Sequence, residues 1–253
     1  MQKWIRIVFI TIAALAILIV GVVYFLNEDV PKEELRGDAD LMADRMMSAV
    51  HIEAWDSLKL VSWTFPGDHD YLWDKERNFV EHSWGDNRIL LHTKTLTGIA
   101  YENGQLMEDS LKMRKKLEKG WSHFCNDSWW LNAPVKAMDP GVERSIVETE
   151  DGERGLKVEY SSGGVTPGDI YVWILDENYL PLSYKMWVSI IPVGGLEFTW
   201  EDWKELPGGA LVAQKHVSKG MTLELSNIKG GIDFEDLGVK DPFDELAQKV
   251  QEE

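Results

Sequence analysis

Six histidines are the residues of this chain best suited to bind a metal ion. Zinc and similar transition metals need three or four converging ligands, often supplied by an H-x-H or H-x-x-x-H pair on one element. No such pair occurs in the sequence. His82 and His92 are expected on adjacent strands, where Asp70 or His69 could complete a site, but dispersed and hydrogen-bonded histidines explain the pattern more simply. The sequence therefore predicts no metal and no cofactor.

Motifs for nucleophilic and acid–base catalysis are also missing. The chain has no G-x-S-x-G sequence, and its Gly-Gly pairs lack the flanking residues of phosphate-binding loops. The single cysteine, Cys125, lies in an apolar and aromatic stretch that should raise the pKa of its thiol and leave it unreactive. Carboxylate pairs such as Glu201 and Asp202 are expected by chance among 43 acidic residues. We therefore expect a protein that is not an enzyme.

Twelve tryptophans are the second unusual feature of the sequence. Each Trp side chain buries about 150–250 Å² and serves equally well in a protein core or in the wall of an apolar pocket. The core beneath a sheet is the simpler explanation for most of them. The candidates for lining a cavity are Trp63, Trp173 and Trp187 on predicted strands, and Trp129 and Trp130 on a predicted loop.

The net charge of −17 restricts the partners of the chain, which has 26 basic and 43 acidic residues. Nucleic acids are bound chiefly by Lys and Arg that neutralise phosphates, so this acidic chain should repel them. Apolar, carbohydrate, cationic and protein partners are compatible with the charge. We therefore expect no nucleic-acid partner.

A membrane anchor is predicted for residues 4–26. The 20 residues from Ile7 to Leu26 carry no charge, and a helix of that length spans roughly 30 Å, the thickness of the hydrocarbon core of a bilayer. A cleaved signal peptide has a shorter apolar region and small residues at its cleavage site, where this chain has Tyr24, Phe25 and Leu26. The short N-terminal tail should stay cytoplasmic, which makes the large domain extracytoplasmic, and periplasmic if the cell has an outer membrane.

The chain is predicted to divide into an anchor (1–26), a polar linker (27–37) and a β-rich extracytoplasmic domain (38–253). A first helix is expected over Asp38–Trp55, capped by Asp38 or Asp40. Short β-rich runs follow, separated by turn pairs such as Asn103-Gly104 and Asp151-Gly152, which is typical of antiparallel hairpins. A helical segment from Glu108 to about Trp130 should break at Gly120, and residues 126–141 should form a loop.

Two of the predicted strands are apolar on both faces. Ile170–Leu175 and Met186–Val188 lack the alternation of a sheet that is solvated on one side. Such strands must be covered twice, either by helices on one face and a second sheet on the other, or by curling around a cavity. We therefore predict a mainly β domain with helices.

Several short motifs resemble one known group of proteins. Asp176–Pro181 in one turn, then Phe198–Trp203 and Gly208-Gly209, are similar to the D-x-x-x-x-P, F-x-D-[YW] and G pattern of the carrier and receptor of the lipoprotein-localisation (Lol) system. Phe124–Gly141, His51–Trp55 and Trp73–Arg77 resemble an uncharacterised bacterial family near that superfamily. The resemblance implies a curved antiparallel half-barrel that is covered by helices and holds acyl chains in an apolar cavity. An uncleaved N-terminal helix departs from the carrier and the receptor.

Three functions are therefore open. The first is a non-catalytic, membrane-anchored extracytoplasmic domain that binds a lipid or another apolar ligand in a half-barrel cavity. The second is an envelope module for protein–protein interaction, whose core is filled by its own side chains and whose acidic surface binds a partner. The third is a carbohydrate-active protein with a Trp-lined cleft and a carboxylate pair.

Overall fold

The computed structural model describes residues 4, 6–12, 15, 21, 27–32, 34–162, 165 and 167–251. Much of the predicted anchor, residues 4–26, lies outside the described residues. Among the helices that are described, none combines the length and the apolar character needed to cross a bilayer. The described apolar side chains of this segment, including Trp4 and Phe9, are exposed.

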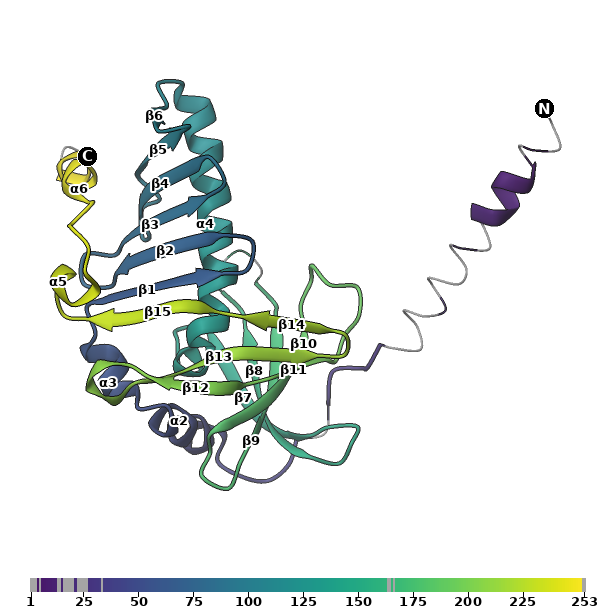
Figure 1. The fold of residues 1–253 in the computed structure, drawn as a ribbon. Coiled ribbons are helices and arrows are strands. Elements are labelled where there is room, and N and C mark those ends of the chain that lie inside the picture. The colour runs from purple at the N-terminus through teal and green to yellow at the C-terminus, as the bar shows by residue number, and fades with distance from the viewer. Residues whose placement is uncertain are drawn as a thin grey trace.

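Antiparallel sheets and one long helix dominate the domain, as predicted for a mainly β protein with helices (Figure 1). The strands of the described chain form three sheets. The largest, in the order β15-β1-β2-β3-β4-β5-β6, contains β1 (Leu60–Phe65), β2 (His69–Asp74), β3 (Phe79–Trp84), β4 (Asn87–His92), β5 (Gly98–Glu102), β6 (Gln105–Leu106) and β15 (Ser226–Gly231). The second, in the order β11-β10-β9-β8-β7, contains β7 (Val142–Glu148), β8 (Arg154–Tyr160), β9 (Ile170–Leu175), β10 (Pro181–Trp187) and β11 (Leu196–Thr199). The third contains β12 (Glu201–Glu205), β13 (Leu211–Ser218) and β14 (Met221–Glu224).

The hairpin turns follow the turn chemistry of the sequence. Asn103 and Gly104 both have positive φ, at 52° and 75°, in the two-residue turn between β5 and β6. Glycine and asparagine tolerate this left-handed region better than other residues, so the pair favours a tight turn here. The resemblance implies a curved half-barrel, and the hydrogen bonds of the described strands form three antiparallel sheets.

The helix α4 (Ser110–Asn132) differs from its prediction, because it does not break at Gly120. Asp109 caps its N-terminus by accepting hydrogen bonds from the backbone of Leu111 and Lys112. A Cβ at Gly120 would lie 2.1 Å from Cδ1 of Ile89, so the glycine lets α4 pack closely on β4. The predicted loop over residues 126–141 is also wrong in its first half, because residues 126–132 complete α4 before the 3-10 turn η1 (Ala133–Lys136).

The first predicted helix is two helices. Asp38 caps α2 (Ala39–Ala49), as predicted, by accepting a hydrogen bond from the backbone of Leu41. His51 then adopts a left-handed conformation, with a φ of 58°, and separates α2 from α3 (Ile52–Ser57). The remaining short elements are η2 (Pro207–Gly209), α5 (Phe234–Leu237) and α6 (Asp244–Gln251).

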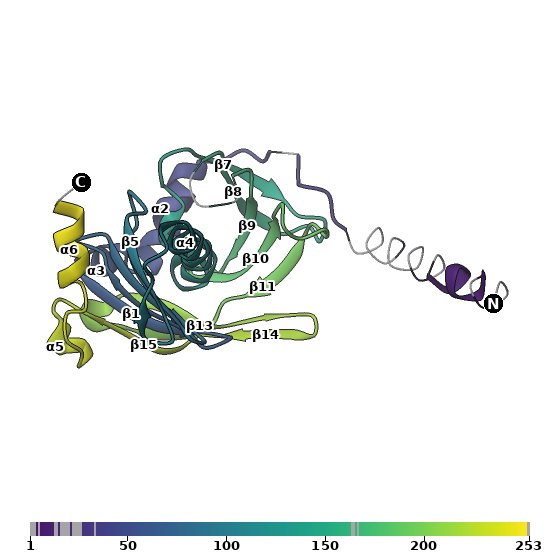
Figure 2. The same ribbon diagram turned by 90° about the horizontal axis from the view of Figure 1, so that it is seen from above.

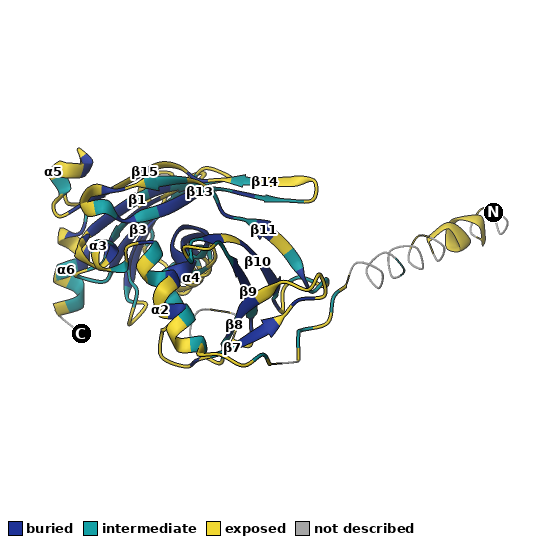
Figure 3. Cartoon of the chain, turned by 90° about the horizontal axis from the view of Figure 1, so that it is seen from below, coloured by how far each residue is buried: buried dark blue, intermediate teal, exposed yellow. Residues whose placement is uncertain are grey.

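The main core lies between the sheets and α4. Figure 2 looks nearly along α4 and shows the strands arranged around it, and Figure 3 shows buried residues where the sheets face this helix. A second apolar cluster on the outer face of the largest sheet is covered by the C-terminal segment through Leu237 of α5, Leu246 of α6 and Phe243 between the two helices. The strands expected to need cover on both faces are β9 and β10 of the second sheet. Tyr171 and Met186 line the cavity on one face, and Val172, Ile174 and Trp187 form a separate apolar cluster on the other.

The predicted linker is fastened to the domain along its described length, residues 27–32 and 34–37, which we call the strap. At one end, the backbone of Glu28 donates to the carbonyl oxygen of Gly194 over 3.0 Å. At the other end, the backbone of Leu35 donates to the carbonyl oxygen of Ile146 on β7 over 2.7 Å. The strap thus joins the β10–β11 loop to the opposite edge of the second sheet.

Candidate functional site

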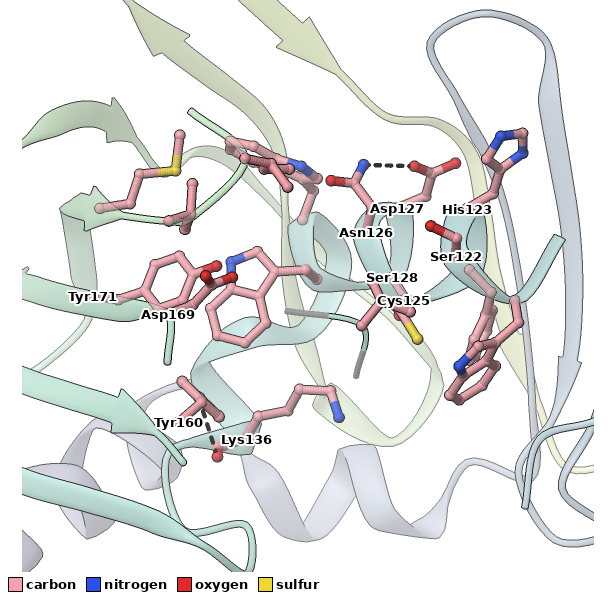
Figure 4. A pocket seen from close by; sticks show the side chains of 18 of the residues that line it. Ser122, His123, Cys125, Asn126, Asp127, Ser128, Lys136, Tyr160, Asp169 and Tyr171 are labelled. Carbon is pink, nitrogen blue, oxygen red and sulfur yellow. Dashed lines mark hydrogen bonds between the residues drawn. The ribbon is translucent and has the colours of Figure 1, made fainter. Parts of the chain in front are cut away.

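A cavity of about 650 Å³ lies between α4 and the second sheet (Figure 4). This volume falls within the roughly 300–1,000 Å³ typical of pockets for small ligands. Its walls come from the C-terminal half of α4, from β9 and β10, and from the loops that follow β8 and β10. The apolar lining residues are Phe65, Trp121, Phe124, Trp129, Trp130, Pro140, Tyr160, Val165, Tyr171, Tyr184, Met186, Val188, Ile190 and Ile191.

The structure brings only Trp129 and Trp130 of the five candidate tryptophans to this cavity. Trp129 packs against Tyr171, with ring centroids 4.3 Å apart, and Trp130 packs against Phe198 at 4.8 Å. Both project from α4 and not from a loop, and their neighbouring positions on the helix place them against different strands. This part of α4 therefore forms one wall of the cavity.

The other three candidates lie elsewhere. Trp63 on β1 is 1% exposed and stacks on Tyr71 with a centroid separation of 4.5 Å. Trp173 on β9 is fully buried against Tyr184 and Trp200. Trp187 on β10 belongs to the opposite face of the second sheet, where it packs on Val147, Val172 and Ile174. Alternation along the strand explains this last placement, since Met186 takes the cavity side.

Two polar atoms in the cavity lining, Nε1 of Trp129 and the hydroxyl oxygen of Tyr184, face each other without a well-aligned hydrogen bond. Burial raises the pKa of Tyr184 well above its ordinary value, so its hydroxyl stays protonated. Buried polar groups of this kind cost stability unless something hydrogen-bonds to them. Because the indole N–H is directed at the Tyr184 oxygen, the hydroxyl hydrogen of Tyr184 is the donor left for an acceptor oxygen of a ligand.

Charged groups at the cavity are few and already engaged. The amino group of Lys136 lies 3.4 Å from the carboxylate of Asp139, and both side chains are partly exposed. Asp169 accepts a hydrogen bond from the backbone of Ser189 over 3.2 Å. Figure 4 shows Lys136, Tyr160 and Tyr171 on one side of the pocket and the α4 residues His123 and Asp127 on the other. Lys136 is the one Lys or Arg among the described residues of the lining.

A polar cluster lies where α4 meets β2 and β3. Asp127, which is 2% exposed, accepts a hydrogen bond from the Tyr71 hydroxyl over 2.6 Å and from Nδ1 of His69 over 2.7 Å. Nε2 of His82 lies 3.1 Å from Nδ1 of His123, and Nδ1 of His82 lies 3.2 Å from the carbonyl oxygen of Asp70. His69, His123 and Asp127 also line the cavity.

Burial sets the protonation states in this region. Desolvation lowers the pKa of His82 to about 3, and desolvation together with nearby His69 lowers the pKa of His123. Burial also raises the pKa of the Cys125 thiol to about 12, which agrees with the unreactive cysteine predicted from sequence. At neutral pH the imidazoles of His82 and His123 and the thiol of Cys125 are therefore uncharged.

The histidine cluster differs from the one considered at the level of sequence. His82 and His69 are part of it, whereas His92 bonds to Thr95 at the far end of β4 and Asp70 contributes only its backbone oxygen. His123 comes from α4, 41 residues away from His82 in the chain. Local spacing could not reveal this arrangement, because it depends on how α4 packs on the largest sheet.

No family model and no curated protein matches the chain. Two solved structures are similar in fold. A DUF1329 family protein from Desulfovibrio piger has 10% sequence identity and a TM-score of 0.45, and the match covers 84% of this chain and 99% of that chain. An outer membrane lipoprotein-sorting protein domain from Vibrio parahaemolyticus has 9% identity and a TM-score of 0.35, with 79% and 97% covered.

Proposed function

We propose that the chain is a non-catalytic, membrane-anchored extracytoplasmic protein that binds an amphiphile with an acyl chain in the cavity between α4 and the second sheet. The cavity carries this proposal, because its volume of about 650 Å³ and its aromatic and aliphatic walls suit an apolar ligand.

The polar atoms suggest how the ligand would be oriented. Ile190, Val165 and Asp139 are exposed and lie at the mouth, whereas Tyr184 and Met186 are buried. The acyl chain would therefore lie along the buried end, and the head group would stay near Lys136. Lys136 would then contact an anionic or polar head group at the mouth.

The cavity also favours this function over the alternatives. An interaction module with a self-filled core needs no space of this size beside its buried aromatic residues. A carbohydrate-active enzyme needs two carboxylates that act on a sugar. In this cavity the carboxylates of Asp127, Asp139 and Asp169 already pair with His69, Lys136 and the backbone of Ser189, respectively. The 20-residue uncharged segment supports membrane attachment and an extracytoplasmic location for the domain.

The proposal is tested by identifying what the full chain retains through purification. An organic extract of the wild type should contain an acyl lipid at a stoichiometry that Ile191→Trp reduces, because the indole would occupy the cavity. Leu182→Trp is the matched control, since Leu182 is 51% exposed on β10 and is outside the lining. All three proteins share the anchor, so equal lipid content in all three would contradict the proposal.

A further inference from the structure

Three imidazoles from separate elements converge beside the cavity. His69 on β2, His82 on β3 and His123 on α4 each offer one ring nitrogen, and these atoms all lie within 4.8 Å of one another. His82 is fully buried, and the other two are half-buried. Three converging nitrogen donors match the protein ligand set of many zinc sites that keep a fourth position open.

We propose that His69, His82 and His123 bind one zinc ion, with Asp127 as a positioning residue. Imidazole suits zinc and neighbouring first-row divalent ions, whereas Mg²⁺ and Ca²⁺ prefer oxygen ligands. The inference does not depend on the proposed acyl ligand, because it uses a different set of atoms.

The second layer of hydrogen bonds supports this assignment. Metal-binding histidines usually donate their other ring N–H to a carboxylate or a backbone oxygen, which fixes the tautomer. His69 has such a partner in the carboxylate of Asp127 at 2.7 Å, and His82 has one in the carbonyl oxygen of Asp70 at 3.2 Å. In both residues this pairing leaves Nε2 as the nitrogen that carries the lone pair. In His82 that lone pair faces Nδ1 of His123 at 3.1 Å, a contact that a bound metal would replace.

Asp127 is itself held rigidly. It accepts hydrogen bonds from the Tyr71 hydroxyl at 2.6 Å and from the Asn126 amide at 2.8 Å, and its residue is 2% exposed. The carboxylate therefore positions His69 while its own orientation is fixed by two donors. The negative charge also offsets part of the charge that a bound cation would bring into this buried place.

Binding requires a small rearrangement of the rings. Zn–N bonds of 2.0–2.1 Å place neighbouring ligand nitrogens about 3.3 Å apart in a tetrahedral site. His82 Nε2 and His123 Nδ1 are already 3.1 Å apart. The rings of His69 and His123 are stacked, however, with centroids 4.5 Å apart and planes 17° apart, so one of them must turn. Both rings border the cavity, which provides space for this rotation.

The test uses the full chain in detergent, without a polyhistidine tag and stripped with EDTA. Co²⁺ is titrated first, because a four-coordinate nitrogen site gives intense visible absorption, and Zn²⁺ is then used to displace it. We expect one ion per wild-type chain. His123→Gln should weaken Co²⁺ binding by at least about tenfold, and His92→Gln, outside the cluster, should bind as the wild type does.

Asp127→Asn tests the positioning role separately. The amide should weaken binding by about 10- to 100-fold and shift the Co²⁺ absorption bands while one ion per chain still binds. His69→Gln provides a second ligand variant if His123→Gln folds poorly. The proposal would be overturned if the wild type bound neither Co²⁺ nor Zn²⁺, or if His123→Gln bound Co²⁺ as tightly as the wild type. It would also be overturned if His92→Gln lost as much Co²⁺ affinity as His123→Gln.

Discussion

The indole nitrogen of Trp187 donates a hydrogen bond to the backbone oxygen of Glu28, with the two atoms 2.8 Å apart. The same strap residue places its carboxylate 3.0 Å from the amino group of Lys185, a side chain that is 2% exposed and also pairs with Asp151. Neighbouring residues of β10 thus hold the strap by two kinds of contact. The segment that leads to the predicted anchor is therefore bound to the second sheet by specific contacts.

The Trp187→Phe substitution tests the fastening of the strap. Phenylalanine keeps most of the apolar contact but removes the hydrogen bond, so the free energy of unfolding should fall by about 1 kcal/mol. Trypsin should also cleave faster after Lys32 and Arg36, because local opening of the strap becomes easier. Trp203→Phe, on β12 in another sheet, is the control, and equal cleavage rates in the two variants would show that the hydrogen bond does not hold the strap.

Gly120 gives a prediction about the packing of α4. In an exposed helix, replacing glycine with alanine stabilises by roughly 1 kcal/mol. Here the new Cβ would lie 2.1 Å from Cδ1 of Ile89, so Gly120→Ala should destabilise by about 1–3 kcal/mol in urea unfolding. The double variant Gly120→Ala with Ile89→Val removes the clashing methyl group and should recover part of the loss. A more stable single variant would show that α4 can move away from β4.

His216 should make the domain sensitive to acid. It is fully buried beside Trp130 and Trp200, and burial lowers its pKa to about 4. An unfolded chain takes up this proton below about pH 6.5, whereas the folded chain stays neutral until about pH 4. Stability is therefore lost as the pH falls through this window, by about 2–3 kcal/mol from this residue.

Urea unfolding of wild type and His216→Phe at pH 7.5 and pH 4.5 isolates this contribution. Other titrating groups act equally on both proteins, so the wild type should lose about 2–3 kcal/mol more than the variant between the two pH values. Equal losses in the two proteins would mean that His216 accepts a proton in the folded state at little cost.

Cys125 reports on access to the cavity. Its thiol lines the cavity, and burial raises the thiol pKa to about 12, so little of the reactive thiolate exists near pH 8. A thiol reagent should label the folded chain much more slowly than the urea-unfolded chain. An acyl ligand should lower the labelling rate of the folded chain further. A labelling rate that does not change when the ligand is added would show that the ligand binds outside the cavity.

Sequence patterns predicted those parts of the fold that depend on neighbouring residues. The Asn103-Gly104 turn and the Asp38 cap are read from local chemistry, and the structure contains both. Gly120 misled the prediction, because a glycine that permits close helix–sheet packing has the same local signature as one that ends a helix.

The site was less predictable, because its residues meet only through tertiary packing. Trp129 and Trp130 line the cavity, yet Trp63 and Trp173 serve the core, and residue type alone does not distinguish these roles. His69, His82 and His123 lie on three elements, so no short motif could connect them. Their convergence becomes visible only when α4 is placed on the largest sheet.

The most direct test of acyl binding is a titration of the full chain, held in an amphipathic polymer, with saturated fatty acids that lengthen by two methylenes at a time. Each buried methylene contributes about 0.8 kcal/mol, so each step should tighten binding by about fifteenfold until the cavity is full. Ile191→Trp should reach this limit at a shorter chain than wild type or Leu182→Trp. Affinities that do not change with chain length, or that are the same in Ile191→Trp and wild type, would contradict an acyl chain in this cavity.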